Sequence, residues 1–218
     1  TSIVYGVTRD KVISLDTILS DGKKVVFQAL SPEDFKQKCG QKDLEGMLYR
    51  QAFEELSLQE AREEIHAQFP KKSIHRRNTG YAVDELLKAS QFEGTADFNF
   101  CKLLAGSEGT LAVTTEIKIS LDPLPDPIEI VVAAHFESIH ESMKSAQVAM
   151  KHPVTAVELM DKIILDCTKE SIEYSKNRYF VEGDPKALLM IEFRGKTLEE
   201  AMAKGEALIA DLKAAGYG

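Results

Sequence analysis

The chain has 218 residues, of which 44% are hydrophobic and 28% charged, with 13 Gly and 7 Pro. This balance is that of an ordinary folded protein, and it excludes a collagen-like, low-complexity or wholly disordered chain. With 27 basic against 35 acidic residues the net charge is −8, which argues against binding to nucleic-acid backbones or anionic membrane surfaces.

Three cysteines stand far apart, at positions 39, 101 and 167, and no CxxC pair occurs. Their odd number and wide spacing predict neither a disulfide framework nor a zinc knuckle, and they favour a reducing compartment. No apolar run approaches the roughly 20 residues of a membrane-spanning helix. We therefore expect a cytoplasmic protein. Because the sequence opens without Met or a signal-peptide pattern, we also expect it to be an internal fragment of something longer.

The first elements in the chain are β structure. Residues 11–19 and 24–30 are apolar and β-branched, and Ser20-Asp21-Gly22 lies between them. Two such runs around Asp-Gly predict a β-hairpin. Ser31-Pro32 then predicts the start of a short helix, because Ser is a favoured cap and Pro fits the first turn.

Residues 44–69 change to a helical period. The apolar face is expected to contain Leu44, Met47, Leu48, Gln51 and Glu55. Residues 57–60, Ser-Leu-Gln-Glu, have the pattern of a capping box and predict a second helix that ends at Pro70. A basic stretch follows over residues 71–80, and a short helix is expected over residues 83–89.

A small-residue turn, Gly106-Ser107-Glu108-Gly109, leads into an alternating strand over residues 110–121. Three prolines then fall within residues 122–127, and they cannot continue a ladder or a helix. We expect the domain boundary in this linker.

Beyond the linker the pattern alternates between strand and helix. Strands are expected over residues 128–134, 154–159 and 187–193, and helices over residues 138–150, 161–174 and 197–213. Ser138 and Thr197 begin capping boxes. The order predicts an α+β sandwich of the ferredoxin-like kind.

The turn at residues 106–109 is the strongest local sign of binding, since two glycines allow close approach and exposed N–H groups favour an anion. Taken alone, a glycine-rich turn before a strand is more often only a turn. Residues 75–81, His-Arg-Arg-Asn-Thr-Gly-Tyr, suit a phosphate or carboxylate, or a solvated basic loop. The five histidines show no metal-binding spacing, so we expect no metal site. Signatures of P-loop, Rossmann and serine-hydrolase sites are absent from the sequence.

Together these motifs form a more specific pattern. Tyr5-Gly6, the strand ending in residues 19–22, Asn78-Thr79-Gly80-Tyr81 and residues 106–111 (Gly-Ser-Glu-Gly-Thr-Leu) occur in this order. The pattern resembles the FAD-linked oxidases and dehydrogenases of the vanillyl-alcohol oxidase superfamily. The similarity is greatest to the branch with the glycolate oxidase flavin subunit, D-lactate dehydrogenase and D-2-hydroxyglutarate dehydrogenase.

The resemblance implies that residues 1–123 are the C-terminal half of an FAD-binding domain of the PCMH type, with a helical insertion at about residues 41–70. Residues 128–218 would be the N-terminal part of a ferredoxin-like α+β substrate (cap) domain. The residues implied to bind FAD are Tyr5, Gly6, Asn78, Tyr81, Gly106, Ser107, Glu108, Gly109 and Thr110, with Glu108 fixing the turn. The resemblance assigns no catalytic residue in this chain.

The implied activity of the parent protein is oxidation of a D-2-hydroxy acid by hydride transfer to FAD, while the fragment alone is expected to be inactive. The insertion and the Arg76–Tyr81 segment are similar to members with a C-terminal iron–sulfur module, which would lie outside this chain, as would contact with an electron acceptor at the inner membrane. Two alternatives stay open: a flavin-dependent sugar or alditol oxidase, and a non-catalytic small-molecule-binding module. An interrupted sheet edge also leaves association between copies open.

Overall fold

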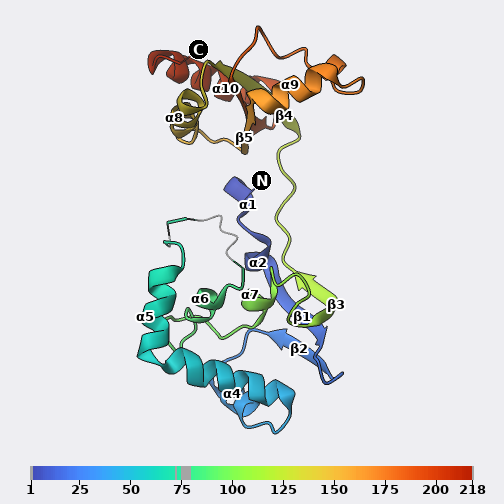
Figure 1. Ribbon diagram of the computed structural model, residues 1–218, viewed down its shortest axis with the longest axis vertical. Helices are drawn as coiled ribbons and strands as arrows, with labels where there is room; N and C mark the ends of the chain where they lie inside the picture. Colours follow the sequence, from blue (N-terminus) through green and yellow to red (C-terminus); the bar gives the residue numbers. More distant parts are fainter. Residues whose placement is uncertain (1, 72, 75–79, 218) are drawn as a thin grey trace. The chain divides into compact units, whose positions relative to one another are not determined.

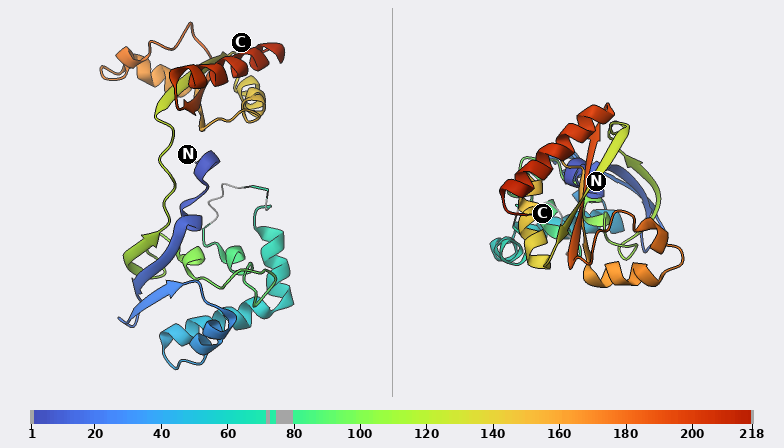
Figure 2. Two further views of the ribbon diagram at one scale, coloured as in Figure 1. Left: turned by 180° about the vertical axis from the view of Figure 1, so that it is seen from behind. Right: turned by 90° about the horizontal axis from the view of Figure 1, so that it is seen from above.

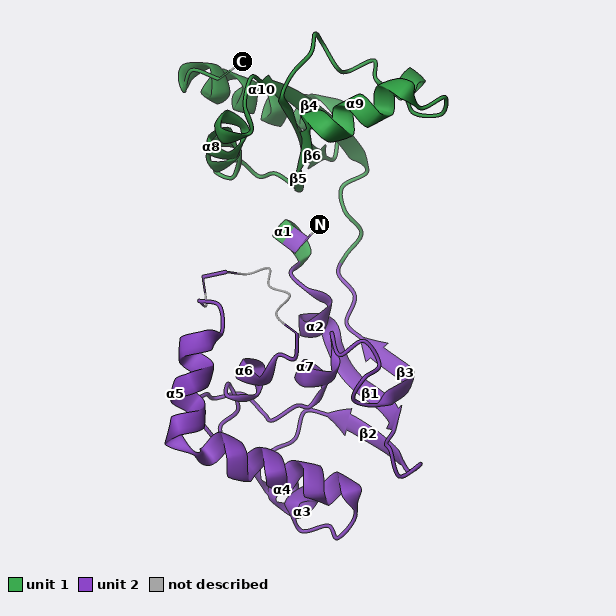
Figure 3. Cartoon of the chain, in the orientation of Figure 1, with its two compact units in different colours: residues 1, 3–5, 123–218 green, residues 2, 6–122 purple. Residues whose placement is uncertain are grey.

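A computed structural model describes residues 2–71, 73–74 and 80–217. Contacts divide these residues into an N-terminal unit, residues 6–122 with Ser2, and a C-terminal unit, residues 123–217 with residues 3–5 (Figure 3). The division falls between Asp122 and Pro123, within the proline-rich stretch.

The N-terminal unit follows the short helix α1 (Ser2–Tyr5) and combines a small sheet with several helices (Figure 1). Its elements are α2 (Thr8–Lys11), β1 (Val12–Ile18), β2 (Lys24–Gln28), α3 (Pro32–Cys39), α4 (Leu44–Ser57), α5 (Gln59–Gln68), α6 (Val83–Leu86), α7 (Cys101–Leu104) and β3 (Val113–Ile119).

The sheet has the order β2-β1-β3, and both pairings are antiparallel. Leu15 on β1 lies opposite Phe27 on β2 and opposite Ile117 on β3. The predicted hairpin is confirmed, and Gly22 in its turn has a φ of +80°. The strong β-branched runs and the Asp-Gly turn specify this hairpin locally.

An aromatic cluster forms the centre of this unit. The ring of Phe98 lies 4.7 Å from that of Phe35 and 4.8 Å from that of Phe100, and Tyr49 lies 4.8 Å from Phe100. Phe27 on β2 completes the cluster. These rings hold the helices to the hairpin, because aromatic side chains bury large areas and favour such tilted contacts.

The helical stretch predicted from residue 44 is present as two helices, but two of its details differ. The face directed at the core contains Tyr49 and Leu56, whereas Met47 is 47% exposed. The packing partner is the distant aromatic cluster, which the local pattern did not reveal. The capping box at Ser57 is wrong: Ser57 ends α4, and Leu58 precedes α5 without a side-chain cap. Asp43 caps α4 instead, accepting from Gly46 N.

Strand β3 is shorter than predicted, and its alternation does not lead to burial. All seven of its residues are exposed, including Ile117 at 58%. It pairs with β1 only, and the apolar side chains of this unit gather over β1 and β2. The alternating pattern therefore identified a strand without identifying a buried face.

The C-terminal unit contains three strands and three α-helices among its described residues. Its elements are β4 (Ile128–Phe136), α8 (Ile139–Ala149), β5 (Ala156–Asp161), α9 (Lys162–Glu170), the 3-10 turn η1 (Ser175–Asn177), β6 (Ala187–Gly195) and α10 (Leu198–Ala214).

Strand β6 lies between β4 and β5 and is antiparallel to both. β4 and β5 are therefore parallel to each other and form, with α8, a βαβ unit split by β6, as in ferredoxin-like folds. Helices α8 and α10 cover one face of the sheet and α9 lies on the other (Figure 2). The predicted α+β class is confirmed.

Helix starts in this unit agree with the sequence pattern. Ser138 accepts from Glu141 N, and Thr197 accepts from Glu200 N, as their capping boxes predict. Helix α9 ends at Glu170 rather than at residue 174, where the chain turns through η1.

Candidate functional site

The turn between α7 and β3 has an unusual backbone. The φ angle is +94° at Gly106, +54° at Glu108 and +74° at Gly109, whereas Ser107 between them has an ordinary negative φ. Where the sign of φ changes from residue to residue, neighbouring N–H groups point into one concavity, which favours anions. The N–H groups of Gly106, Glu108 and Gly109 have no acceptor among the described residues. They are therefore available to a ligand.

Helix α7 holds this turn to the core from below. Cys101 is fully buried, and its thiol donates to Phe27 O on β2 at 3.1 Å. Burial raises the pKa of the Cys101 thiol to about 11, so the thiol stays protonated and keeps this bond at neutral pH. Asn99 Oδ1 accepts from Cys101 N at the start of the helix. The support of the turn is thus a fixed part of the core.

Tyr81 joins the turn from a distant part of the chain. The Thr110 hydroxyl donates to Ser107 O at 2.6 Å, and Tyr81 Oη lies 2.7 Å from Thr110 Oγ1. Since a hydroxyl has one proton to donate, Tyr81 is the donor to Thr110. Tyr81 is 44% exposed, so its ring borders the turn on the solvent side.

Helices α2 and α7 are joined by reciprocal contacts, which we call the α2–α7 clasp (Arg9, Asp10, Lys102 and Ala105). Arg9 donates through Nε to Lys102 O and through Nη2 to Ala105 O, each at 2.9 Å. In return, Lys102 Nζ donates to Arg9 O at 3.2 Å and lies 3.7 Å from Asp10 Oδ1. The clasp ends directly before Gly106.

Comparison with known proteins gives this geometry a context. Residues 127–218 match the family described as FAD linked oxidases, C-terminal domain. Over 97% of its length the chain is 29% identical to a D-2-hydroxyglutarate dehydrogenase of Pseudomonas putida. These similarities support a FAD-linked oxidase or dehydrogenase of the vanillyl-alcohol oxidase superfamily.

Two further relatives have the same name. The D-2-hydroxyglutarate dehydrogenase of Pantoea ananatis is 28% identical over 89% of the chain, and that of Escherichia coli is 27% identical over 95%. The matches cover 20%, 18% and 19% of the three relatives. The chain therefore spans about a fifth of the length of the curated relatives it matches.

The family matched by residues 127–218 is FAD-linked, and the turn at residues 106–109 fits an anionic part of such a cofactor. Three N–H groups lack acceptors among the described residues, and a Cβ placed on Gly109 would meet nothing within 4 Å. A ligand can therefore approach the backbone closely at Gly109. The Arg9 guanidinium, 3.0 Å from the Cβ position of Gly106, adds positive charge beside the concavity.

The structure brings together six of the predicted site residues: Tyr81 and residues 106–110. Gly6 (φ +71°) lies in the same unit, shortly before α2. Tyr5 ends α1 and groups with the C-terminal unit. Asn78 lies outside the described residues. The exposed Glu108 carboxylate accepts from no described residue, so the contacts that hold the turn come from its neighbours.

Sequence reasoning missed Arg9 and Lys102. Each donates hydrogen bonds to main-chain carbonyls that are 93 to 96 positions away in the sequence. A carbonyl is present at every residue, so no partner side chain signals the contact. The one sequence signal was an Arg-Asp pair shortly after Gly6.

A cavity of about 860 Å³ adjoins the clasp in the N-terminal unit, with Arg9, His66, Lys88 and Glu93 among its walls. His66 Nε2 lies 2.6 Å from Glu93 Oε2, and Arg62 Nε lies 3.8 Å from Glu93 Oε1. Because these opposite charges pair with one another, the cavity shows no single preference for a ligand charge.

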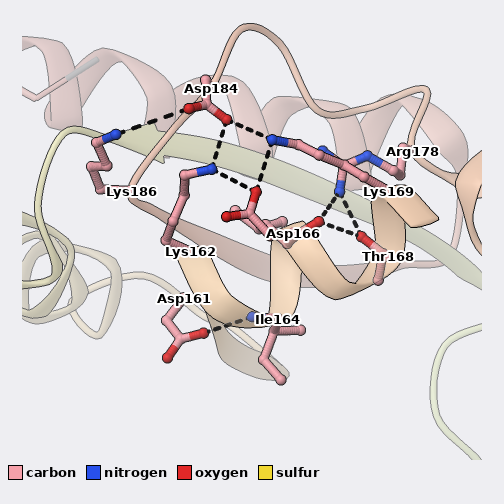
Figure 4. Close-up of polar contacts among 10 residues, drawn as sticks. Asp161, Lys162, Ile164, Asp166, Thr168, Lys169, Arg178, Asp184 and Lys186 are labelled. Atoms are coloured by element: carbon pink, nitrogen blue, oxygen red, sulfur yellow. Dashed lines mark hydrogen bonds and ion pairs between the residues drawn. The ribbon is translucent and has the colours of Figure 1, made fainter. Parts of the chain in front are cut away.

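A charged cluster fastens residues 171–186 to α9 in the C-terminal unit (Figure 4). Asp184 Oδ1 accepts from Lys162 at 2.9 Å and from Lys169 at 2.8 Å, while Asp166 pairs with both lysines. Hydrogen bonds from Lys169 and Lys162 hold the pKa of Asp184 well below its usual range. Since lysines and aspartates satisfy one another, the cluster is a fastening rather than a binding site.

Neither a metal site nor a membrane-spanning helix is present among the described residues. No three His, Cys, Asp or Glu side chains gather as ligands for a metal ion there. Within the same residues, no helix is long and apolar enough to cross a membrane.

Proposed function

We propose that this chain is part of a flavin-dependent dehydrogenase that oxidises a D-2-hydroxy acid, of the lactate, glycolate or 2-hydroxyglutarate type. The observation that carries the proposal is the turn at residues 106–109, with three N–H groups that lack acceptors among the described residues. The names of the relatives support the substrate class. An aliphatic hydroxyl is hard to oxidise without a redox cofactor, which is consistent with a flavin-binding chain.

In this proposal the N-terminal unit provides part of the FAD site. The N–H groups of Gly106, Glu108 and Gly109 bind anionic phosphate oxygens, and Ser107 and Thr110 fix the turn between them. Tyr81 holds Thr110 and borders the turn, with Asn78, Gly6 and Tyr5 completing the flavin contacts. When bound, FAD would supply the acceptor for the hydride that the hydroxyl-bearing carbon loses.

The same proposal assigns the two halves of the chain. Residues 1–123 would be the C-terminal half of the FAD-binding domain, with the helices α4 and α5 as an insertion, and residues 128–218 the first part of the substrate domain. The protein would be cytoplasmic, and an iron–sulfur module and the contact with an electron acceptor at the inner membrane would lie outside this chain.

A flavin titration tests the proposal. The purified chain is titrated with FAD by fluorescence quenching, with FMN and AMP as controls, and the same titration is made on the longer protein that contains it. Saturable binding of FAD by either one, with reduction of the flavin by a D-2-hydroxy acid in the longer protein, is the expected result. If the longer protein binds no FAD, the proposal is overturned.

A further inference from the structure

The α2–α7 clasp supplies hydrogen bonds that the short helix α7 cannot form by itself. Helix α7 has only four residues, too few to stabilise itself, and a helix end leaves several carbonyls without partners. Within the described residues, Ala105 N bonds Cys101 O and Ser107 N bonds Leu104 O, which leaves Lys102 O and Ala105 O to Arg9. Arg9 therefore completes the hydrogen bonding at the point where the turn begins.

The guanidinium group is suited to this position by its shape. Its donors lie in one rigid plane, so Nε and Nη2 reach two carbonyls at once, which a lysine ammonium on a flexible stem does not reproduce. Both bonds are partly buried, and bonds to charged groups are stronger than neutral ones. Arg9 thus fixes the orientation of the peptide that enters Gly106.

The closeness of Arg9 gives Gly106 a second requirement besides its positive φ. A Cβ on Gly106 would lie 3.0 Å from Arg9 Nη2, tighter than an ordinary contact. Because Gly106 has no Cβ, the Arg9 guanidinium can lie directly against the turn. Arginine and glycine form one local arrangement, in which each is needed for the position of the other.

We propose that Arg9 is a positioning residue for the anion-binding turn: it sets the backbone of residues 106–109 and places a positive charge beside their N–H groups. This inference rests on the proposed FAD site for its functional consequence. Its structural part concerns the turn alone and holds for the chain without flavin.

Three variants test the role of Arg9. Arg9→Gln removes the charge and the planar fork, Arg9→Lys keeps the charge, and Arg62→Gln removes a partly buried arginine elsewhere in the same unit as the matched control. Hydrogen–deuterium exchange of peptides covering residues 104–111 is measured without flavin, next to the thermal midpoint and the FAD affinity of the longer protein.

We expect exchange of the hydrogen-bonded amides of Ala105, Ser107 and Thr110 to accelerate about tenfold in Arg9→Gln, while other peptides of the unit keep wild-type rates. FAD affinity should fall about tenfold in Arg9→Gln, fall less in Arg9→Lys, and stay unchanged in Arg62→Gln. Unchanged exchange in Arg9→Gln, or an equal loss of affinity in Arg62→Gln, would overturn the inference. Failure of the wild-type protein to bind FAD would contradict the proposed function, whereas the exchange result would still decide whether Arg9 sets the turn.

A double-variant comparison covers the case in which Arg9→Gln unfolds. Gly106→Ala leaves all charges in place and sets a methyl group against Arg9 Nη2. It should accelerate exchange of the Ala105, Ser107 and Thr110 amides in the wild-type background, and do so less beside Arg9→Lys, where the space is larger. Additive effects of the two changes would contradict the close pairing of Arg9 with Gly106.

Discussion

Gly109 adopts a positive φ beside the N–H groups that bind the cofactor in the proposed function. Its φ is +74° and its Cβ position is open, so Gly109→Ala adds backbone strain without a collision, about 1–2 kcal/mol. We expect Gly109→Ala to weaken FAD binding about tenfold, the effect of 1.4 kcal/mol. The measurement is the flavin titration of the longer protein.

Gly22→Ala is the matched control for this prediction. Gly22 has a φ of +80° and an equally open Cβ position, but it lies in the turn between β1 and β2. Both variants should lose a similar free energy of unfolding, and only Gly109→Ala should lose FAD affinity. Equal losses of affinity would mean that the turn at residues 106–109 has no special part in binding.

The hydroxyl of Tyr81 offers a second test at the scale of one residue. Tyr81→Phe removes the hydrogen bond to Thr110 and keeps the ring, so the free energy of unfolding should fall by about 0.5–1.5 kcal/mol. Exchange of the hydrogen-bonded amides of Ser107 and Thr110 should accelerate. Tyr174→Phe is the control, because the Tyr174 hydroxyl has no partner among the described residues. Similar exchange in both variants would contradict a role for Tyr81 in holding the turn.

At the level of residues, the sequence allowed one part of the site to be predicted and concealed the other. Gly106 and Gly109 are recognisable because a positive φ restricts the residue type. Arg9 was not recognisable, because its partners are carbonyls, and every residue has one. A sequence motif therefore indicates positions where the identity of the side chain matters. It does not indicate hydrogen bonds to main-chain atoms, because every residue has those atoms.

At the scale of elements, the attachment of residues 171–186 to α9 depends on pairs of charged side chains. Lysine hydrogen bonds lower the pKa of both Asp184 and Asp166, so these carboxylates favour the folded form above their ordinary pKa of about 4. The favourable contribution is lost as pH falls through the lowered values. We expect exchange at residues 171–186 to accelerate, relative to the rest of the unit, as pH drops below about 4.

Salt and one substitution make this prediction specific. High salt should loosen the same segment at neutral pH, because exposed pairs are screened. Asp184→Asn should loosen the segment at neutral pH and reduce its dependence on acid, which peptide-resolved exchange measures. A segment whose exchange ignores pH, salt and Asp184→Asn would show that Arg178, through Leu165 O and Thr168, holds it instead.

Elements with local signals were predictable, and those defined by distant partners were not. Ser31, Ser138 and Thr197 cap helices because a side-chain oxygen reaches an N–H three residues on. The core face of α4 depends on Phe98 and Phe100, which follow it by about 50 residues. Local periodicity does not contain that information, so it placed Met47 in the core in place of Tyr49.

For the whole molecule, the two units have separate cores. The buried cluster of the N-terminal unit includes Phe98, and that of the C-terminal unit includes Leu208, both with no exposed surface. No buried residue belongs to both clusters among those described. Stability should therefore be divided between the units, and each core substitution should act on one of them.

We expect Phe98→Ala to cost the N-terminal unit about 3–5 kcal/mol and Leu208→Ala to cost the C-terminal unit about 2–5 kcal/mol. Peptide-resolved exchange in denaturant checks which unit loses protection. Because the turn at residues 106–109 is built on the N-terminal core through Cys101, Phe98→Ala should also abolish FAD binding at a temperature where Leu208→Ala retains it. Loss of protection in both units from either substitution would instead mean that the two cores unfold as one.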